Sequence, residues 1–158
     1  MKQKKKLAIA GASGFIGRWF IETYKDDYHI IALSRKKIAP SNSDIEWRTV
    51  DLFSISSSIE ALEGIDYALY LVHSMQPSTR LNQSNFEDTD LLLADNFSRA
   101  AEACSLSHIV YVGGILPKDN LNISKHLQSR YEVERVLGSR QTPITPIRAG
   151  IIIGPGGS

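Results

Sequence analysis

Three glycines near the start of the chain have a spacing that suits binding of a pyrophosphate. Gly11, Gly14 and Gly17 follow the apolar run Leu7–Ala10, and an amphipathic helical pattern continues from them to Tyr24. In such a strand–turn–helix, the glycines permit a sharp turn, close approach of main-chain N–H groups to phosphate, and close packing of helix on strand. The motif predicts a dinucleotide site at a helix N-terminus; the alternative is a structural turn, because turns use glycine for many reasons. The other motif residues assigned to this site are Ser13, Phe15 and Ile16.

A basic turn after the second apolar run indicates which dinucleotide would bind. In sites of this kind, an acid at this position binds the ribose 2′-hydroxyl of NAD, whereas an arginine accommodates the 2′-phosphate of NADP. Here Leu33 is followed by Ser34, Arg35 and two lysines, with no acid. Arg35 can hold a phosphate through its planar guanidinium, and Ser34 can donate a further hydrogen bond. We expect NADP(H) to be preferred over NAD(H), the alternative being a solvated basic turn.

Two further strand ends supply candidate cofactor-binding residues. Asp51, followed by Leu52, can meet the adenine amino group, or it can cap the helix that follows. Val72, His73 and Ser74 follow the fourth apolar run, where the backbone typically passes the ribose and nicotinamide of a bound cofactor. A simple loop start explains these three residues equally well.

Apolar runs alternate with helical patterns along the whole chain. Several runs are continuously apolar, as expected for strands that are covered on both faces. The alternation predicts right-handed βαβ crossovers and therefore an α/β fold with a doubly wound parallel sheet. The predicted strands are Leu7–Ala10, His29–Leu33, Glu46–Val50, Tyr67–Val72, His108–Val112 and Thr145–Ile152. The predicted helices are Phe15–Tyr24, Ser56–Leu62, Asn82–Ala103 and Leu127–Leu137.

The longest predicted helix carries an apolar stripe that should pack on the sheet. Its members recur at steps of three and four residues: Leu91, Ala94, Phe97, Ala101 and Cys104. Leu92 and Leu93 lie off this stripe, and an exposed second face built on them would support a homodimer.

Composition narrows the class of protein. The chain has 158 residues, of which 42% are hydrophobic and 22% charged, and its net charge is +1. These values fit one globular domain and give no reason to expect nucleic acid or a membrane as partner. The lysine-rich start runs into an apolar stretch that Gly11 interrupts too early for a signal peptide. Because the chain has a single cysteine, we expect a cytoplasmic protein. Its histidines, cysteine and carboxylates are not spaced as metal ligands usually are, so we expect no metal site.

With these residues in hand, the chain resembles the extended and atypical short-chain dehydrogenase/reductases, and especially the NmrA-like and YbjT-like proteins often labelled nucleoside-diphosphate-sugar epimerases. The resemblance implies a Rossmann fold with strand order 3-2-1-4-5-6 and NADP at the carboxyl ends of the strands. It also implies that residues 1–158 are a cofactor-binding domain and that a C-terminal substrate region is absent from this sequence. The matching segments are Gly11–Gly17, Leu33–Arg35, Val50–Leu52, Val110–Gly114, Ile147–Gly150 and Ile153–Pro155.

The same resemblance raises the question of catalysis. Active members use a serine after the fifth strand and a Tyr-x-x-x-Lys pair on the next helix, whereas here the strand ends in Gly113 and Gly114. His126 occupies the tyrosine position and Arg130 the lysine position, with Glu134 four residues later. Near a helix N-terminus and one turn from Arg130, His126 is expected to be neutral.

Three roles for His126 stay open: a catalytic group acting with Arg130, a contact to cofactor or substrate, or an incidental surface histidine. Arg130 can hold ribose hydroxyls but will hardly titrate. We also assign Gly113, at the end of the fifth predicted strand, to the cofactor site. The sequence thus favours an NADP(H)-dependent reductase or epimerase-like oxidoreductase acting on an unidentified small molecule. The alternative is a non-catalytic regulatory protein that senses NADP.

Overall fold

In the part of the chain that the structure describes, six parallel strands form one central sheet. The computed structural model describes residues 4–37, 45–73, 84–117 and 123–156. The strand order is β3-β2-β1-β4-β5-β6, which confirms the predicted doubly wound α/β fold and its topology. The strands are β1 (Lys6–Ala10), β2 (His29–Ser34), β3 (Glu46–Thr49), β4 (Tyr67–Tyr70), β5 (His108–Gly114) and β6 (Ile144–Ala149). The helices are α1 (Phe15–Tyr24), α2 (Ile55–Leu62), α3 (Ser84–Ala103) and α4 (Lys125–Leu137).

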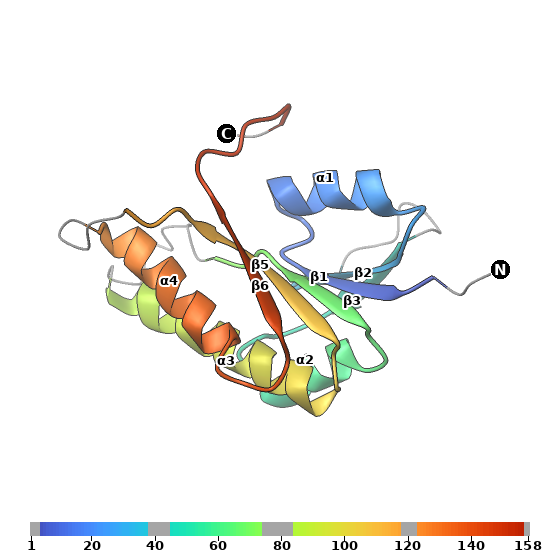
Figure 1. Cartoon of the computed structure of the whole chain (residues 1–158). Helices are drawn as coiled ribbons and strands as arrows, with labels where there is room; N and C mark the ends of the chain where they lie inside the picture. Colours follow the sequence, from blue (N-terminus) through green and yellow to red (C-terminus); the bar gives the residue numbers. More distant parts are fainter. Residues whose placement is uncertain (1–3, 38–44, 74–83, 118–122, 157–158) are drawn as a thin grey trace.

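Helices lie on both sides of the sheet, with α1 on one side and α2, α3 and α4 on the other (Figure 1). Each side has its own apolar core. The smaller core packs Ile21 of α1 on Ile9 and Ile30 of the central strands. The larger core includes Leu62 of α2 and Phe97 of α3. Strands β1, β2 and β4 lie between the two cores and are buried along most of their length, which explains why their sequences are continuously apolar.

The long helix α3 packs as the apolar stripe predicts, with one correction. Phe97 is fully buried and its ring lies 4.9 Å from that of Tyr70. Leu93 is also buried in the core, whereas Leu92 is 47% exposed. The expectation of an exposed face that combines Leu92 and Leu93 is therefore wrong, because Leu93 faces inward. Cys104 lies at the margin of the core.

Several element boundaries differ from the predicted ones. The strand expected to reach Ile152 stops at Ala149, and Ile151 beyond it is 91% exposed. Helix α4 begins at Lys125, two residues early, because the Ser124 hydroxyl accepts a hydrogen bond from the main chain of the first turn. The predicted start of the long helix, Asn82, lies outside the described residues.

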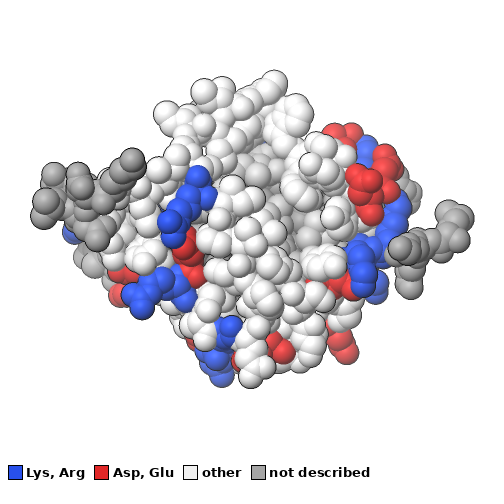
Figure 2. Space-filling view, in the orientation of Figure 1, with Lys and Arg blue, Asp and Glu red and all other residues white. Residues whose placement is uncertain are grey.

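The surface over β6 and the segment that follows it is largely uncharged, and charged side chains gather mainly at the two sides of this view (Figure 2). The large apolar side chains exposed there include Ile147 and Ile153. Within the described ranges, no helix has the length and apolar character needed to cross a membrane.

Candidate dinucleotide site

The glycine loop between β1 and α1 has a conformation and packing that require glycine. Gly11 has a φ of 89°, in the region that side chains rarely adopt, and its carbonyl accepts a hydrogen bond from the Gly14 N–H at 3.0 Å. A Cβ on Gly17 would lie 2.5 Å from the Gly11 carbonyl oxygen and 2.7 Å from Ala12 Cα. The third glycine therefore lets α1 approach the end of β1 closely, as the motif predicts.

The N-terminus of α1 has no side-chain cap. Gly14 is the N-cap and provides no side-chain hydrogen bond. By contrast, Ser54 caps α2 and Ser124 caps α4, each accepting a main-chain N–H at 3.3 Å. The first N–H groups of a helix have no partner within the helix, so those of Phe15 and Ile16 remain available to an external anion.

The end of β2 brings the predicted selectivity residues to the glycine loop. The strand register pairs Ala10 with Leu33, so Ser34 and Arg35 emerge beside Gly11. The Ser34 Oγ accepts the main-chain N–H of Lys36 at 3.2 Å, which leaves the hydroxyl hydrogen free to donate elsewhere. Arg35 is exposed. A long cation and a hydroxyl donor thus stand at the edge of the sheet where α1 begins.

The structure decides one of the two interpretations of Asp51, its role as a helix cap. Its Oδ1 accepts the N–H of Phe53 at 3.0 Å, before the helix, and Ser54 is the residue that caps α2. The interpretation of Asp51 as the helix cap is therefore wrong. The Leu52 side chain is 7% exposed and lies in the core. Its carbonyl accepts a hydrogen bond at 2.9 Å from the buried Asn96 amide, which also reaches the Phe53 carbonyl at 3.0 Å.

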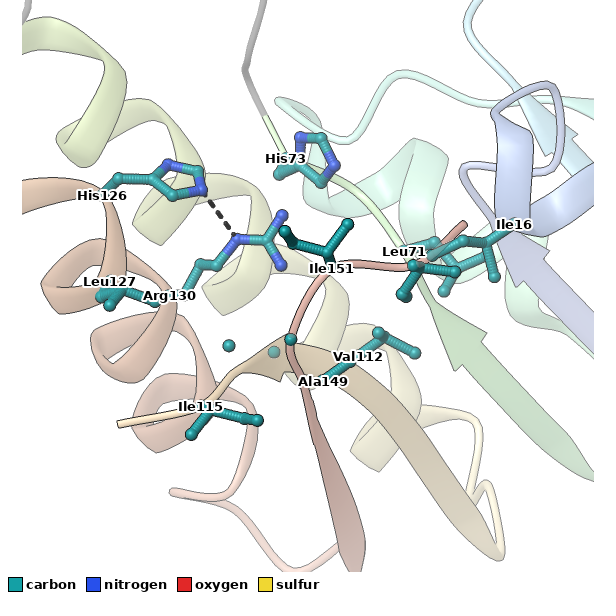
Figure 3. Close-up of a pocket in the computed structure, with 14 residues that line it drawn as sticks. Ile16, Leu71, His73, Val112, Ile115, His126, Leu127, Arg130, Ala149 and Ile151 are labelled. Atoms are coloured by element: carbon teal, nitrogen blue, oxygen red, sulfur yellow. Dashed lines mark hydrogen bonds between the residues drawn. The ribbon is translucent and has the colours of Figure 1, made fainter. Parts of the chain in front are cut away.

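A cleft of about 550 Å³ opens at the carboxyl ends of β4, β5 and β6. His73 follows β4, whereas His126 and Arg130 come from α4, and all three line the cleft (Figure 3). The remaining lining residues are apolar or glycine: Ile16, Leu71, Val112, Gly113, Gly114, Ile115, Leu127, Ala149, Gly150, Ile151 and Ile152. Ser74 lies outside the described residues. Because Ile16 belongs to the first turn of α1, the cleft adjoins the glycine loop.

His126 and Arg130 interact with each other inside this cleft. The Arg130 Nε donates to His126 Nε2 at 3.2 Å. Arginine has no acceptor, so this geometry requires His126 Nε2 to carry no proton. While this bond is formed, Nε2 is not available to exchange a proton with a substrate. The arrangement favours a role for His126 in holding Arg130 over a direct role in proton transfer.

The other titratable side chains near the cleft are also constrained. Tyr111 donates its hydroxyl to the Arg130 main-chain carbonyl at 3.1 Å, and burial is the main cause that raises its pKa to about 12. Partial removal from water lowers the pKa of the His73 ring, although much of the side chain stays exposed. The nearby positive charge of Arg130 lowers this pKa further. Glu134 is bound to Arg148 of β6 through two hydrogen bonds of 2.7 and 3.1 Å, so its carboxylate ties α4 to the sheet.

Sequence reasoning missed two kinds of site residue. One is the apolar lining from β5 and the segment after β6, such as Ile115 and Ile151, for which the local sequence carries no signal. The other is Arg18, directly after the third glycine, whose Nη1 donates to the Ser13 carbonyl at 3.1 Å beside the loop. The position of Arg18 in the first turns of α1, directly after the glycine motif, could have indicated this contact from the sequence.

The strand order, the uncapped helix after a glycine turn and the cleft at the carboxyl edge define a Rossmann-type α/β protein. A family model of the NAD dependent epimerase/dehydratase family matches residues 7–133, and the chain belongs to this family. The predicted membership of the short-chain dehydrogenase/reductase superfamily is thereby confirmed. The narrower likeness to NmrA-like proteins stays a prediction.

The chain spans about half the length of three known proteins to which it is similar. The auxiliary protein GraX of Staphylococcus aureus (strain NCTC 8325 / PS 47) is 29% identical over 145 residues, which cover 89% of this chain and 43% of GraX. The UDP-N-acetylglucosamine 4-epimerase of Bacillus cereus has a TM-score of 0.71 at 24% identity, covering 91% of this chain and 53% of the epimerase. The Bordetella bronchiseptica enzyme WbmG in complex with NAD has a TM-score of 0.76 at 12% identity, covering 93% of this chain and 53% of WbmG. These structural likenesses establish the fold alone.

Proposed function

We propose that the chain is the NADP(H)-binding part of a reductase or epimerase-like oxidoreductase of its family. The observation that carries the proposal is the uncapped N-terminus of α1, reached through a glycine turn and flanked by Arg35. The pyrophosphate would lie on the free N–H groups of α1. A substrate-binding region would lie outside these 158 residues, since the chain spans only about half of its relatives.

The preference for NADP(H) follows from the residues at the end of β2. A 2′-phosphate placed there meets Arg35 and the free hydroxyl hydrogen of Ser34, and no carboxylate follows the strand to repel it. Hydrogen bonds to charged groups contribute about 1.5–3 kcal/mol, which corresponds to a preference of tenfold or more. Asp51, exposed after β3, would meet the adenine amino group. WbmG was solved with NAD, so the proposed preference for NADP(H) rests on these local residues and not on the shared fold.

The nicotinamide half of the cofactor would extend toward the cleft past Val72, His73 and Gly113. When bound, NADP(H) supplies hydride transfer to or from a small-molecule substrate. Within the protein, Arg130 presents its guanidinium to the cleft and His126 fixes the orientation of Arg130.

A second candidate function is binding of NADP(H) without turnover, as in a regulatory protein that senses the cofactor. The favouring observation is that, apart from the His73 ring, the described groups able to give a proton at the cleft are already engaged. His126 Nε2 accepts from Arg130, the Tyr111 hydroxyl is bound to a main-chain carbonyl, and glycines end β5.

The nucleotide assignment is tested by titrating NADPH into the parent chain and the Arg35→Glu variant, with cofactor fluorescence as the readout. Arg135 is exposed on α4 and does not line the cleft, so Arg135→Glu is a control with the same change in net charge. We expect Arg35→Glu to weaken NADPH binding at least tenfold and the control to leave it unchanged. Undiminished binding by Arg35→Glu would remove the assignment.

Turnover is tested separately by following NADPH oxidation against a panel of quinones, aldehydes and nucleotide sugars. Activity lost in both His126→Ala and Arg130→Ala supports the oxidoreductase. Activity that survives both substitutions removes these residues from any mechanism. Tight cofactor binding with no turnover supports the second candidate.

A further inference from the structure

Arg130 brings a permanent positive charge into the cleft between α4 and the sheet. It is half-buried, and its Nε is committed to His126 Nε2 at 3.2 Å. The two Nη atoms lie on the other side of the guanidinium and point into the cleft, toward His73 and Ile151 (Figure 3). Arg130 therefore presents donors that match the two oxygens of a carboxylate or phosphate.

No carboxylate among the described lining residues balances this charge. The lining contains no Asp or Glu, and its other titratable groups are His73 and His126. The carboxylates of the adjoining helices that affect the same region are Asp90 on α3 and Glu134 on α4. Neither lines the cleft, and Glu134 is bound to Arg148.

A bound dinucleotide would not supply the missing anion. Its phosphates are accounted for by the N-terminus of α1 and by Arg35, whereas the nicotinamide ring and its carboxamide carry no negative charge. The Nη atoms of Arg130 face a cleft with no lining carboxylate, so a second ligand that carries an anionic group would gain charge-assisted hydrogen bonds there. The rest of the lining is apolar, with Leu71, Val112 and Leu127 on its walls.

We propose that the cleft binds, beside the cofactor, an organic anion that has a carboxylate or phosphate monoester on an apolar body, with Arg130 as its receptor. His126 is a positioning residue that holds the guanidinium through its Nε2. The proposal rests on the proposed function for the location of the cofactor, and it names the substrate class of the same site. A volume of about 550 Å³ suits a small organic ligand.

The test uses benzoate, phenyl phosphate and the uncharged benzamide as probes, titrated by NMR into the chain with and without saturating NADPH. We expect at least one of the two anions to bind tenfold or more tightly than benzamide. Arg130→Gln should abolish that difference, while Arg135→Gln on the same helix should keep it. The ratio of the benzoate and phenyl phosphate affinities then shows which anionic group the site prefers.

The role of His126 is tested by His126→Leu and His126→Gln, because the glutamine Oε1 can accept from Arg130 Nε whereas leucine cannot. Anion affinity should fall in the leucine variant and recover in the glutamine variant. The proposal is overturned if no anion binds, if benzamide binds equally well, or if Arg130→Gln keeps the preference. It is also overturned if Arg130→Gln weakens NADPH binding more than anion binding.

The design separates this proposal from the proposed function. Failure of NADPH to bind overturns the cofactor assignment, whereas anion selectivity in the chain without NADPH still reports on Arg130. If the parent chain binds NADPH but shows no preference for an anion over benzamide, only the present proposal is overturned.

Discussion

Substitution of the second and third glycines of the loop should separate packing from cofactor binding. In Gly17→Ala, the new Cβ would lie 2.5 Å from the Gly11 carbonyl oxygen, where ordinary contact begins at 3.4 Å. Its near neighbours are main-chain atoms, so no flexible side chain can move aside and α1 itself must retreat. In Gly14→Ala, the Cβ meets the Gly11 carbonyl oxygen at 3.2 Å, which a small adjustment relieves.

The expected magnitudes follow from these distances. Overpacking costs about 1–3 kcal/mol, and a 2.5 Å contact with main-chain atoms belongs in the upper part of that range, at about 2–3 kcal/mol. Gly→Ala within a helix returns about 1 kcal/mol of propensity. Gly17→Ala should therefore lower the free energy of unfolding by about 1–2 kcal/mol, whereas Gly14→Ala should change it by less than about 0.5 kcal/mol. Both should weaken NADPH binding at least tenfold, the first by displacing the N–H groups of α1 and the second by filling the approach to the pyrophosphate.

Urea denaturation measures the stability change and NADPH fluorescence titration measures binding, on the same preparations. The reasoning is refuted if Gly17→Ala is as stable as the parent, since the close contact would then carry no cost. It is equally refuted if Gly14→Ala binds NADPH with the parent affinity.

Two further predictions concern stability. Asn96→Ala removes the amide that serves the Leu52 and Phe53 carbonyls, so it should cost about 1–3 kcal/mol in urea denaturation; a loss below about 0.5 kcal/mol would contradict this. The folded protein holds the pKa of His73 below the ordinary 6.5, so the unfolded chain binds more protons between those two values. Stability should therefore fall as the pH drops through that window, and His73→Gln should flatten this slope; an unchanged slope would show that His73 does not cause it.

The fold was predictable because its determinants are local and repeated. The glycine spacing around Gly14 and the continuously apolar strands specify a parallel sheet with crossovers, and both are visible in short windows of sequence. The failures occur where long-range packing decides. The sequence pattern places Leu93 on a second helix face, yet Leu93 is buried where α3 packs on the core. The apolar run continues to Ile152, although the strand pairing of β6 ends at Ala149.

The candidate site divides in the same way. Arg35 follows directly from its position after β2, and the helical spacing of His126 and Arg130 places them one turn apart. That these two residues bond to each other depends on side-chain orientation, which the spacing does not determine. The Asn96 contacts to carbonyls more than forty residues away depend on how α3 packs on the sheet, so no local pattern could have indicated them.

The affinity ratio for NADPH and NADH in the unmodified chain tests the central claim most directly. Both cofactors are titrated at the same ionic strength, because the 2′-phosphate contact with Arg35 weakens as salt screens it. A dissociation constant for NADPH at least tenfold lower than that for NADH is the predicted result. Equal affinities would contradict the NADP assignment, and failure to bind either cofactor would contradict the account of the glycine loop itself.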